Sequence, residues 1–125
     1  MTSVRPTSVT VVAALWAAAT LASCGGGSSW SERHGHAVSD AQARVMNVCV
    51  IDPGDSRSCA AAGRALAAAV DEADADGPPT FAGWGGYRNE VAAFARASGA
   101  GRATPQGLAR LETAWDGVAD AVTVR

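Results

Sequence analysis

The segment TPQGLARLETAWDGVADAV, residues 104–122, decides the fold class of this chain. Its large apolar side chains recur at alternating spacings of three and four residues, which places them on one face of an α-helix. They are Leu108, Leu111, Trp115, Val118 and Val122. Thr104 suits the N-cap position, and Pro105 suits the first helical position because that residue needs no amide hydrogen. The segment therefore predicts one amphipathic helix over 105–122, with Trp115 in the core.

Three earlier segments carry helical signals of different kinds. Residues 84–98 repeat the three-and-four spacing with Trp84, Tyr87, Val91, Phe94 and Ser98. Residues 56–74 are rich in alanine, the best helix former, and the following Gly77-Pro78-Pro79 ends a helix. Residues 39–51 have helical spacing, but the β-branched residues within 45–51 leave a strand as the alternative. We expect a helix there, because a single strand would have no partner.

Four amphipathic helices joined by short loops predict an all-α fold, a small bundle of about four helices formed by residues 37–125. The chain has 125 residues and only 6% aromatic residues, so we expect a thin core. Close packing of alanine faces and a disulfide would then matter for stability.

The first 23 residues carry the features of a signal peptide. Arg5 precedes an apolar run over 9–22, which is shorter than the about 20 residues needed to cross a bilayer. The sequence Leu21-Ala22-Ser23-Cys24 follows and resembles the lipobox of bacterial lipoproteins. That resemblance implies cleavage before Cys24 and a diacylglyceryl group on its sulfur. An ordinary secretion signal is the alternative.

The resemblance also implies a location. A protein with several acyl chains, such as palmitate, on Cys24 is held stably at the cell membrane, here on the extracytoplasmic face. The glycines and serines that follow Cys24 are typical of a flexible linker, so we expect residues 24–36 to form the lipidated cysteine and its tether.

Two further cysteines, Cys49 and Cys59, remain if lipid occupies Cys24. They bracket Asp52-Pro53-Gly54-Asp55, a strong turn signal that would bring two helix ends together. Outside the cytoplasm such a pair predicts a structural disulfide. A redox-active or metal-binding pair and two free thiols are the alternatives. The nine intervening residues differ from the C-x-x-C pattern, and no histidine lies nearby.

Two polar segments are candidate metal sites. In an extended tether, His34 and His36 would point the same way, but structural zinc normally needs four ligands and only Glu32 is close in sequence. The acidic run 71–76 superficially resembles a calcium loop, but Gly83 stands where that loop needs a bidentate glutamate. We therefore expect no metal at either segment, and a solvated helix end at 71–76, with Arg64 or Arg88 offsetting its charge.

The segment 81–87 alternates glycines with aromatic residues. Such rings either fold into the core or expose their faces to a ligand, so Trp84 and Tyr87 are candidate ligand-binding residues. No G-x-S-x-G motif occurs, and no histidine lies within 37–125. We therefore predict no catalytic residues and no cofactor.

Composition narrows the class of partner. The ten basic residues are all arginine, and with twelve acidic residues they give a net charge of −2, which argues against nucleic-acid binding. In its lipobox, arginine- and alanine-rich composition and cysteine pair, the chain is similar to small lipoproteins of actinobacteria. We expect a lipid-anchored, non-catalytic module that contacts an envelope protein. A small-ligand or peptide binder using residues 81–87 is the alternative.

Overall fold

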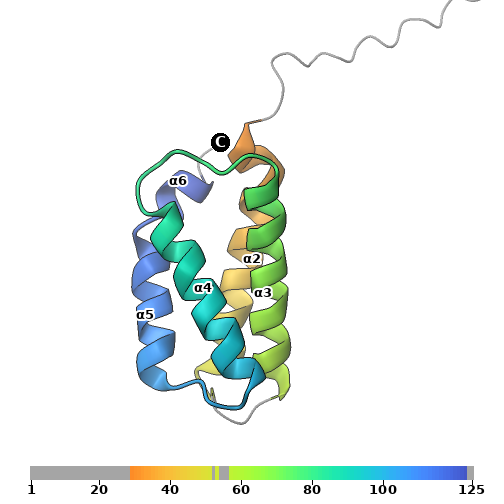
Figure 1. Ribbon diagram of the computed structural model, residues 1–125, viewed down its shortest axis with the longest axis vertical. Helices are drawn as coiled ribbons and strands as arrows, with labels where there is room; N and C mark the ends of the chain where they lie inside the picture. The colour runs from red at the N-terminus through yellow and green to blue at the C-terminus, as the bar shows by residue number, and fades with distance from the viewer. Residues whose placement is uncertain (1–28, 52, 54–56, 124–125) are drawn as a thin grey trace, which may run out of the picture.

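The computed structural model describes residues 29–51, 53 and 57–123, and within them every regular element is helical (Figure 1). A π-helix, η2 (Ser31–Gly35), runs directly into α2 (His36–Cys49). Three longer helices follow, α3 (Arg57–Ala75), α4 (Trp84–Gly99) and α5 (Pro105–Asp116), and then the short α6 (Ala119–Thr123). The predicted all-α bundle is confirmed, and residues 45–49 are helical.

The four long helices lie along the long axis of the molecule. Helix α3 packs against both α2 and α4, and α4 also packs against α5. Helix α6 lies at the end of the bundle where η2 begins, so the first and last described segments of the chain are neighbours (Figure 1). The end of α2, the start of α3 and the connection from α4 to α5 lie at the opposite end.

The predicted apolar faces form the core. Its buried members come from every helix of the bundle, and among the largest are Tyr87, Leu66, Leu111, Val45 and Val70. Small residues let α3 approach α4 closely: a Cβ at Gly63 would stand 2.6 Å from Ser98 Oγ. Because only glycine fits at that distance, the alanine- and glycine-rich α3 contributes close helix packing as well as helix propensity.

The start of α5 follows the predicted capping. The Thr104 side chain accepts a hydrogen bond from the backbone N–H of Gly107 at 3.0 Å, and Pro105 occupies the first turn. At the start of α4, Gly83 adopts a left-handed backbone with φ of +93°, a conformation that glycine adopts without steric cost. Gly83 and Thr104 thus fix the residues at which α4 and α5 begin.

The single helix predicted over 105–122 is wrong in one respect, because the helix breaks after Asp116. Gly117 and Val118 form a turn, with the Val118 N–H bonded to the Trp115 carbonyl at 2.9 Å, before α6 resumes. Glycine is a poor helix former, and the break lets Val118 and Val122 stay buried while α6 packs on η2. Trp115 is only partly buried, with its ring 5.5 Å from that of Tyr87.

The tether predicted over 24–36 is also too long. Residues 31–36 are helical, and Gly35 is buried against α6, where a Cβ would collide with the Val122 carbonyl oxygen. The sequence pattern suggested a linker because residues 31–36 lack an apolar stripe. Their helix is held by contacts with α3 and α6, which lie far away in sequence.

The predicted disulfide is present. Cys49 ends α2, Cys59 lies in the first turn of α3, and their Cα atoms are 4.8 Å apart. Both residues are fully buried. The bridge therefore joins two helix ends and belongs to the core.

Candidate functional site

The two ends of the bundle carry different kinds of side chain. At the end where the described chain begins, residues of η2 meet the end of α3 and the start of α4. We call this group the entry cluster: Trp30, His34, Asp74, Asp76 and Trp84. The indole N–H of Trp30 donates to the Ala73 carbonyl at 2.9 Å, and its ring lies 4.9 Å from that of Trp84.

The carboxylates at the end of α3 are paired with side chains from η2, which precedes α3, and from α4, which follows it. Asp76 accepts hydrogen bonds from His34 Nε2 and from Arg33 Nε, each at 2.8 Å. Asp74 accepts one from Trp84 Nε1 at 2.9 Å and one from Arg88 at 3.0 Å. These contacts correct the expectation of a simply solvated helix end, although Arg88 does offset the charge as anticipated.

The same contacts set the ionisation of the two carboxyl groups. The hydrogen bond from His34, followed by that from Arg33, lowers the pKa of Asp76 below its usual value. The hydrogen bond from Trp84 does most to lower the pKa of Asp74, with Arg88 adding to it. Both groups are therefore carboxylates at neutral pH, and their charges serve to fasten η2 and α4 to α3.

The two histidines do not share a site. An extended segment would have aligned them, but they lie on a helical turn, where residues two apart face different ways. His34 contacts Asp76, whereas His36 lines a pocket on another side of the helix. Among the described residues, no three histidine, cysteine or acidic side chains are grouped so as to hold a metal ion.

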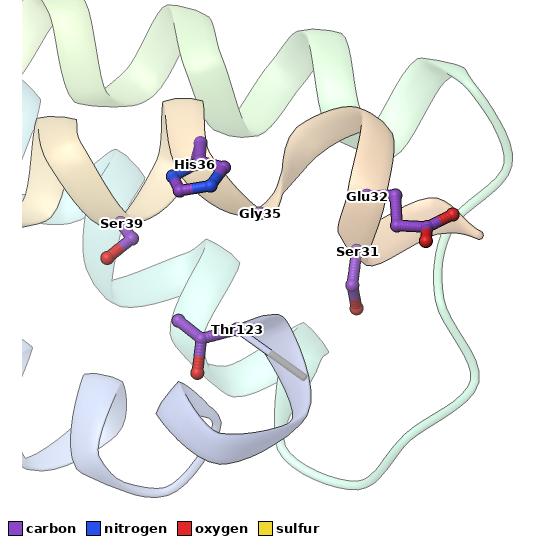
Figure 2. Close-up of a pocket in the computed structure, with 6 residues that line it drawn as sticks. All are labelled: Ser31, Glu32, Gly35, His36, Ser39 and Thr123. Carbon is purple, nitrogen blue, oxygen red and sulfur yellow. The ribbon is translucent and has the colours of Figure 1, made fainter. Parts of the chain in front are cut away.

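That pocket has a volume of about 290 Å³ and lies between η2, α2 and α6 (Figure 2). Its polar lining includes Ser31, His36 and Thr123. The hydroxyl of Ser31 donates to the Ala121 carbonyl at 2.9 Å, and that of Thr123 donates to the Ala119 carbonyl at 2.7 Å. The hydroxyl protons of Ser31 and Thr123 are thus committed to backbone oxygens, and among the described residues no hydrogen bond links the third lining hydroxyl, that of Ser39, to His36. The arrangement therefore does not pair a serine with a base as nucleophilic catalysis requires.

Glu32 also lines this pocket, but its carboxylate forms a hydrogen bond with the backbone that precedes η2. Its carboxylate points away from the His36 ring in Figure 2 and accepts a hydrogen bond from the Ser29 N–H at 2.9 Å. The pocket therefore has hydroxyl oxygens and an imidazole at its wall, without the carboxylate–imidazole pair that would tune an acid or base.

The candidate ligand-binding residues of segment 81–87 lie in the core. Trp84 is 3% exposed and Tyr87 is fully buried, so neither ring offers a face to solvent. Burial raises the pKa of the Tyr87 hydroxyl, which donates to Gln42 Oε1 at 2.7 Å. Of the two possibilities that the sequence left for these rings, the structure shows the core position, because the glycines at 85 and 86 face outward while the aromatic stripe faces α2.

Gln42 was missed by the sequence analysis, although a signal for it exists. Val38, Gln42, Val45 and Cys49 follow the helical spacing of four, three and four residues, and all four are buried. The Gln42 Nε2 group has no hydrogen-bond partner within the described part of the protein. A polar residue in an apolar stripe therefore marked a buried hydrogen bond between α2 and α4.

The opposite end of the bundle carries an apolar feature that we call the distal tip, Val50 and Ile51. Val50 is 65% exposed and Ile51 is 86% exposed, and they are the large hydrophobic side chains that the described residues leave to solvent. They directly follow α2, whose other end continues from η2 (Figure 1). The distal tip thus lies far from the point where the described chain begins, beside the Cys49–Cys59 bridge.

The sequence features of residues 1–28 lie outside the described residues, and these include Cys24. Within residues 29–51, 53 and 57–123, no helix has the length and apolar character that a membrane crossing needs. No family model matches the chain, and no curated protein or solved structure matches it significantly.

Proposed function

We propose that this protein is a lipid-anchored, extracytoplasmic helical module that is held at the cell membrane through Cys24 and contacts an envelope protein through its distal tip. The observation that carries the proposal is the exposure of Val50 and Ile51 at the end of the bundle opposite Ser29. The proposal assigns the chain no catalytic step and no cofactor.

The length of chain between Cys24 and the distal tip limits the distance from the membrane that the tip can reach. Five residue steps separate Cys24 from Ser29, and a fully extended chain spans about 3.6 Å for each, or about 18 Å. The 19 residues of η2 and α2 add about 28 Å at 1.5 Å per residue. The distal tip would then lie within about 46 Å of the lipid, so its partner must present a surface in that layer.

The distal tip is suited to contact for two reasons. Exposed β-branched side chains gain free energy when a partner removes them from water, at about 25 cal/mol per Å². The adjacent disulfide ties the end of α2 to α3, so the backbone before Val50 is already fixed and loses little entropy on binding. A small, rigid apolar contact of this kind fits an accessory role beside a larger envelope protein.

The anchor is tested by Cys24→Ala. We expect this variant to lose the diacylglyceryl mass and to leave the membrane fraction, or to accumulate with its signal peptide uncut, because the acyl chains supply the membrane affinity. Mass spectrometry of the purified protein and membrane fractionation measure the two effects. Asn47→Ala is the control, since it changes an exposed residue outside the lipobox and leaves the disulfide intact. The anchor would be rejected if Cys24→Ala differed in mass from the wild type only by the substituted side chain and kept the same membrane fraction.

The contact is tested by photo-crosslinking in intact membranes. A photoreactive residue at Ile51 is expected to give one discrete crosslinked product, whereas the same residue at Ala68, exposed on the side of α3, is expected to give none. Val50→Ser, combined with the photoreactive residue at position 51, should weaken the product, because it removes the other exposed apolar side chain of the distal tip. Equal products from positions 51 and 68 would show collision without recognition and would reject the distal tip as the contact.

A further inference from the structure

A second feature of the distal end is a cavity of about 240 Å³ between α4 and α5. We call it the arginine cavity and define it by Glu90, Phe94, Arg102, Gly107 and Arg110, which line it. Arg102 belongs to the connection between the two helices, and Gly107 and Arg110 belong to the first turns of α5. This end of the bundle is the one that also carries the distal tip (Figure 1).

The arginine cavity carries more positive than negative charge. Arg102 is exposed, and its guanidinium has no hydrogen bond or ion pair among the described residues. Arg110 Nε lies 3.8 Å from Glu90 Oε1, which is a long contact between side chains that are 65% and 36% exposed. Such a pair is weak. Two guanidinium groups therefore face one carboxylate, and the net charge of the lining is one positive.

The guanidinium of Arg110 lies beside Gly107. One terminal nitrogen of Arg110 lies 3.7 Å from the place that a Cβ of Gly107 would occupy. The guanidinium is therefore folded back over the first turn of α5, on the side of the arginine cavity. Phe94, which is 4% exposed, is an apolar member of the same lining.

We propose that the arginine cavity binds a carboxylate of the protein partner. A guanidinium presents N–H donors in a plane that matches the two oxygens of a carboxylate, and a lining with one net positive charge suits a monoanion. The wall at Phe94 can cover the short apolar stem of an acidic side chain. The position at the distal end favours a protein over the headgroups of the anchoring membrane, and in this respect the inference rests on the proposed function.

The test is a titration of the full chain, purified in detergent micelles, with acetate. Two-dimensional NMR of the arginine Nε–Hε groups should show saturable shifts of Arg102 and Arg110, and acetamide, which is neutral and of the same shape, should cause none. Arg102→Gln and Arg110→Gln are each expected to lower the affinity for acetate about fivefold. Glu90→Gln is expected to raise it, because it frees Arg110 from a competing carboxylate.

Arg44→Gln is the matched control, since it removes one exposed arginine from α2 outside the arginine cavity. An equal loss of affinity in Arg44→Gln would mean that only net charge attracts acetate, and it would overturn the proposal. Shifts caused by inorganic phosphate but not by acetate would overturn the carboxylate as the ligand, and so would a lower affinity in Glu90→Gln.

The outcomes separate this inference from the proposed function. If the photoreactive residue at position 51 gave no crosslinked product while acetate still bound, the distal tip alone would be rejected. Failure of acetate to bind, with the crosslink retained, would reject the arginine cavity alone.

Discussion

Replacing Trp84 with alanine is expected to lower the free energy of unfolding by about 3–5 kcal/mol, the usual cost of removing a buried aromatic ring. Trp84 is 3% exposed, and its ring contacts those of Trp30, Phe81 and Tyr87. The substitution leaves a cavity between η2 and α4 and removes a hydrogen bond to Asp74. Urea unfolding followed by far-ultraviolet circular dichroism measures the change without depending on tryptophan emission.

Trp84→Phe is the control for this prediction. It keeps a six-membered aromatic ring but removes the pyrrole part of the indole with its N–H, so we expect a smaller loss of about 1–3 kcal/mol, from the lost hydrogen bond to Asp74 and a smaller cavity. A loss below 1 kcal/mol in Trp84→Ala would contradict the prediction. It would show that the entry cluster can close around the missing ring.

Removing the disulfide is expected to have the second largest effect. The double substitution Cys49→Ala and Cys59→Ala should lower the free energy of unfolding by about 3 kcal/mol, within the usual range of 2–5 kcal/mol. The bridge closes a short loop of sequence separation 10, so its absence gives the unfolded chain more freedom. The thin core makes that loss large in proportion to the whole, and the melting temperature is the measurement.

Reduced wild-type protein is the control for the disulfide. After complete reduction its melting temperature should approach that of the double variant, since both lack the same covalent link. Equal melting temperatures for the oxidised wild type and the double variant would contradict the prediction. That result would mean that packing at Cys49 and Cys59, which are fully buried, holds the ends of α2 and α3 without the bond.

The candidate sites differ in how far the sequence could predict them. The pairing of Cys49 with Cys59 follows from a turn signal between two helical segments, and the structure confirms it. The hydrogen bond from Tyr87 to Gln42 joins residues 45 positions apart, and helical periodicity alone does not say which faces of two helices meet. The arginine cavity likewise depends on the packing of α4 against α5, which brings Glu90 near Arg110.

The sequence by itself determined that four longer helices form and which of their faces turn inward. Spacing of apolar residues, alanine content, the Thr104 cap and the glycine and proline stops act within a few residues, so they can be identified without knowing the fold. Leu108, Leu111, Val118 and Val122 are buried as that spacing predicts. The resemblance of residues 21–24 to a lipobox is local in the same sense, and the lipid anchor remains a prediction from it.

Only the tertiary structure decided where the domain begins and how its charges are paired. Residues 31–36 have no apolar stripe of their own, yet they are helical because Trp30 bonds to Ala73, 43 residues away, and Gly35 packs against α6. The carboxylates of Asp74 and Asp76 oppose the dipole of α3, and Trp84, Arg88, Arg33 and His34 compensate for this. Such contacts join distant segments, and their free energy exists only once the helices have packed.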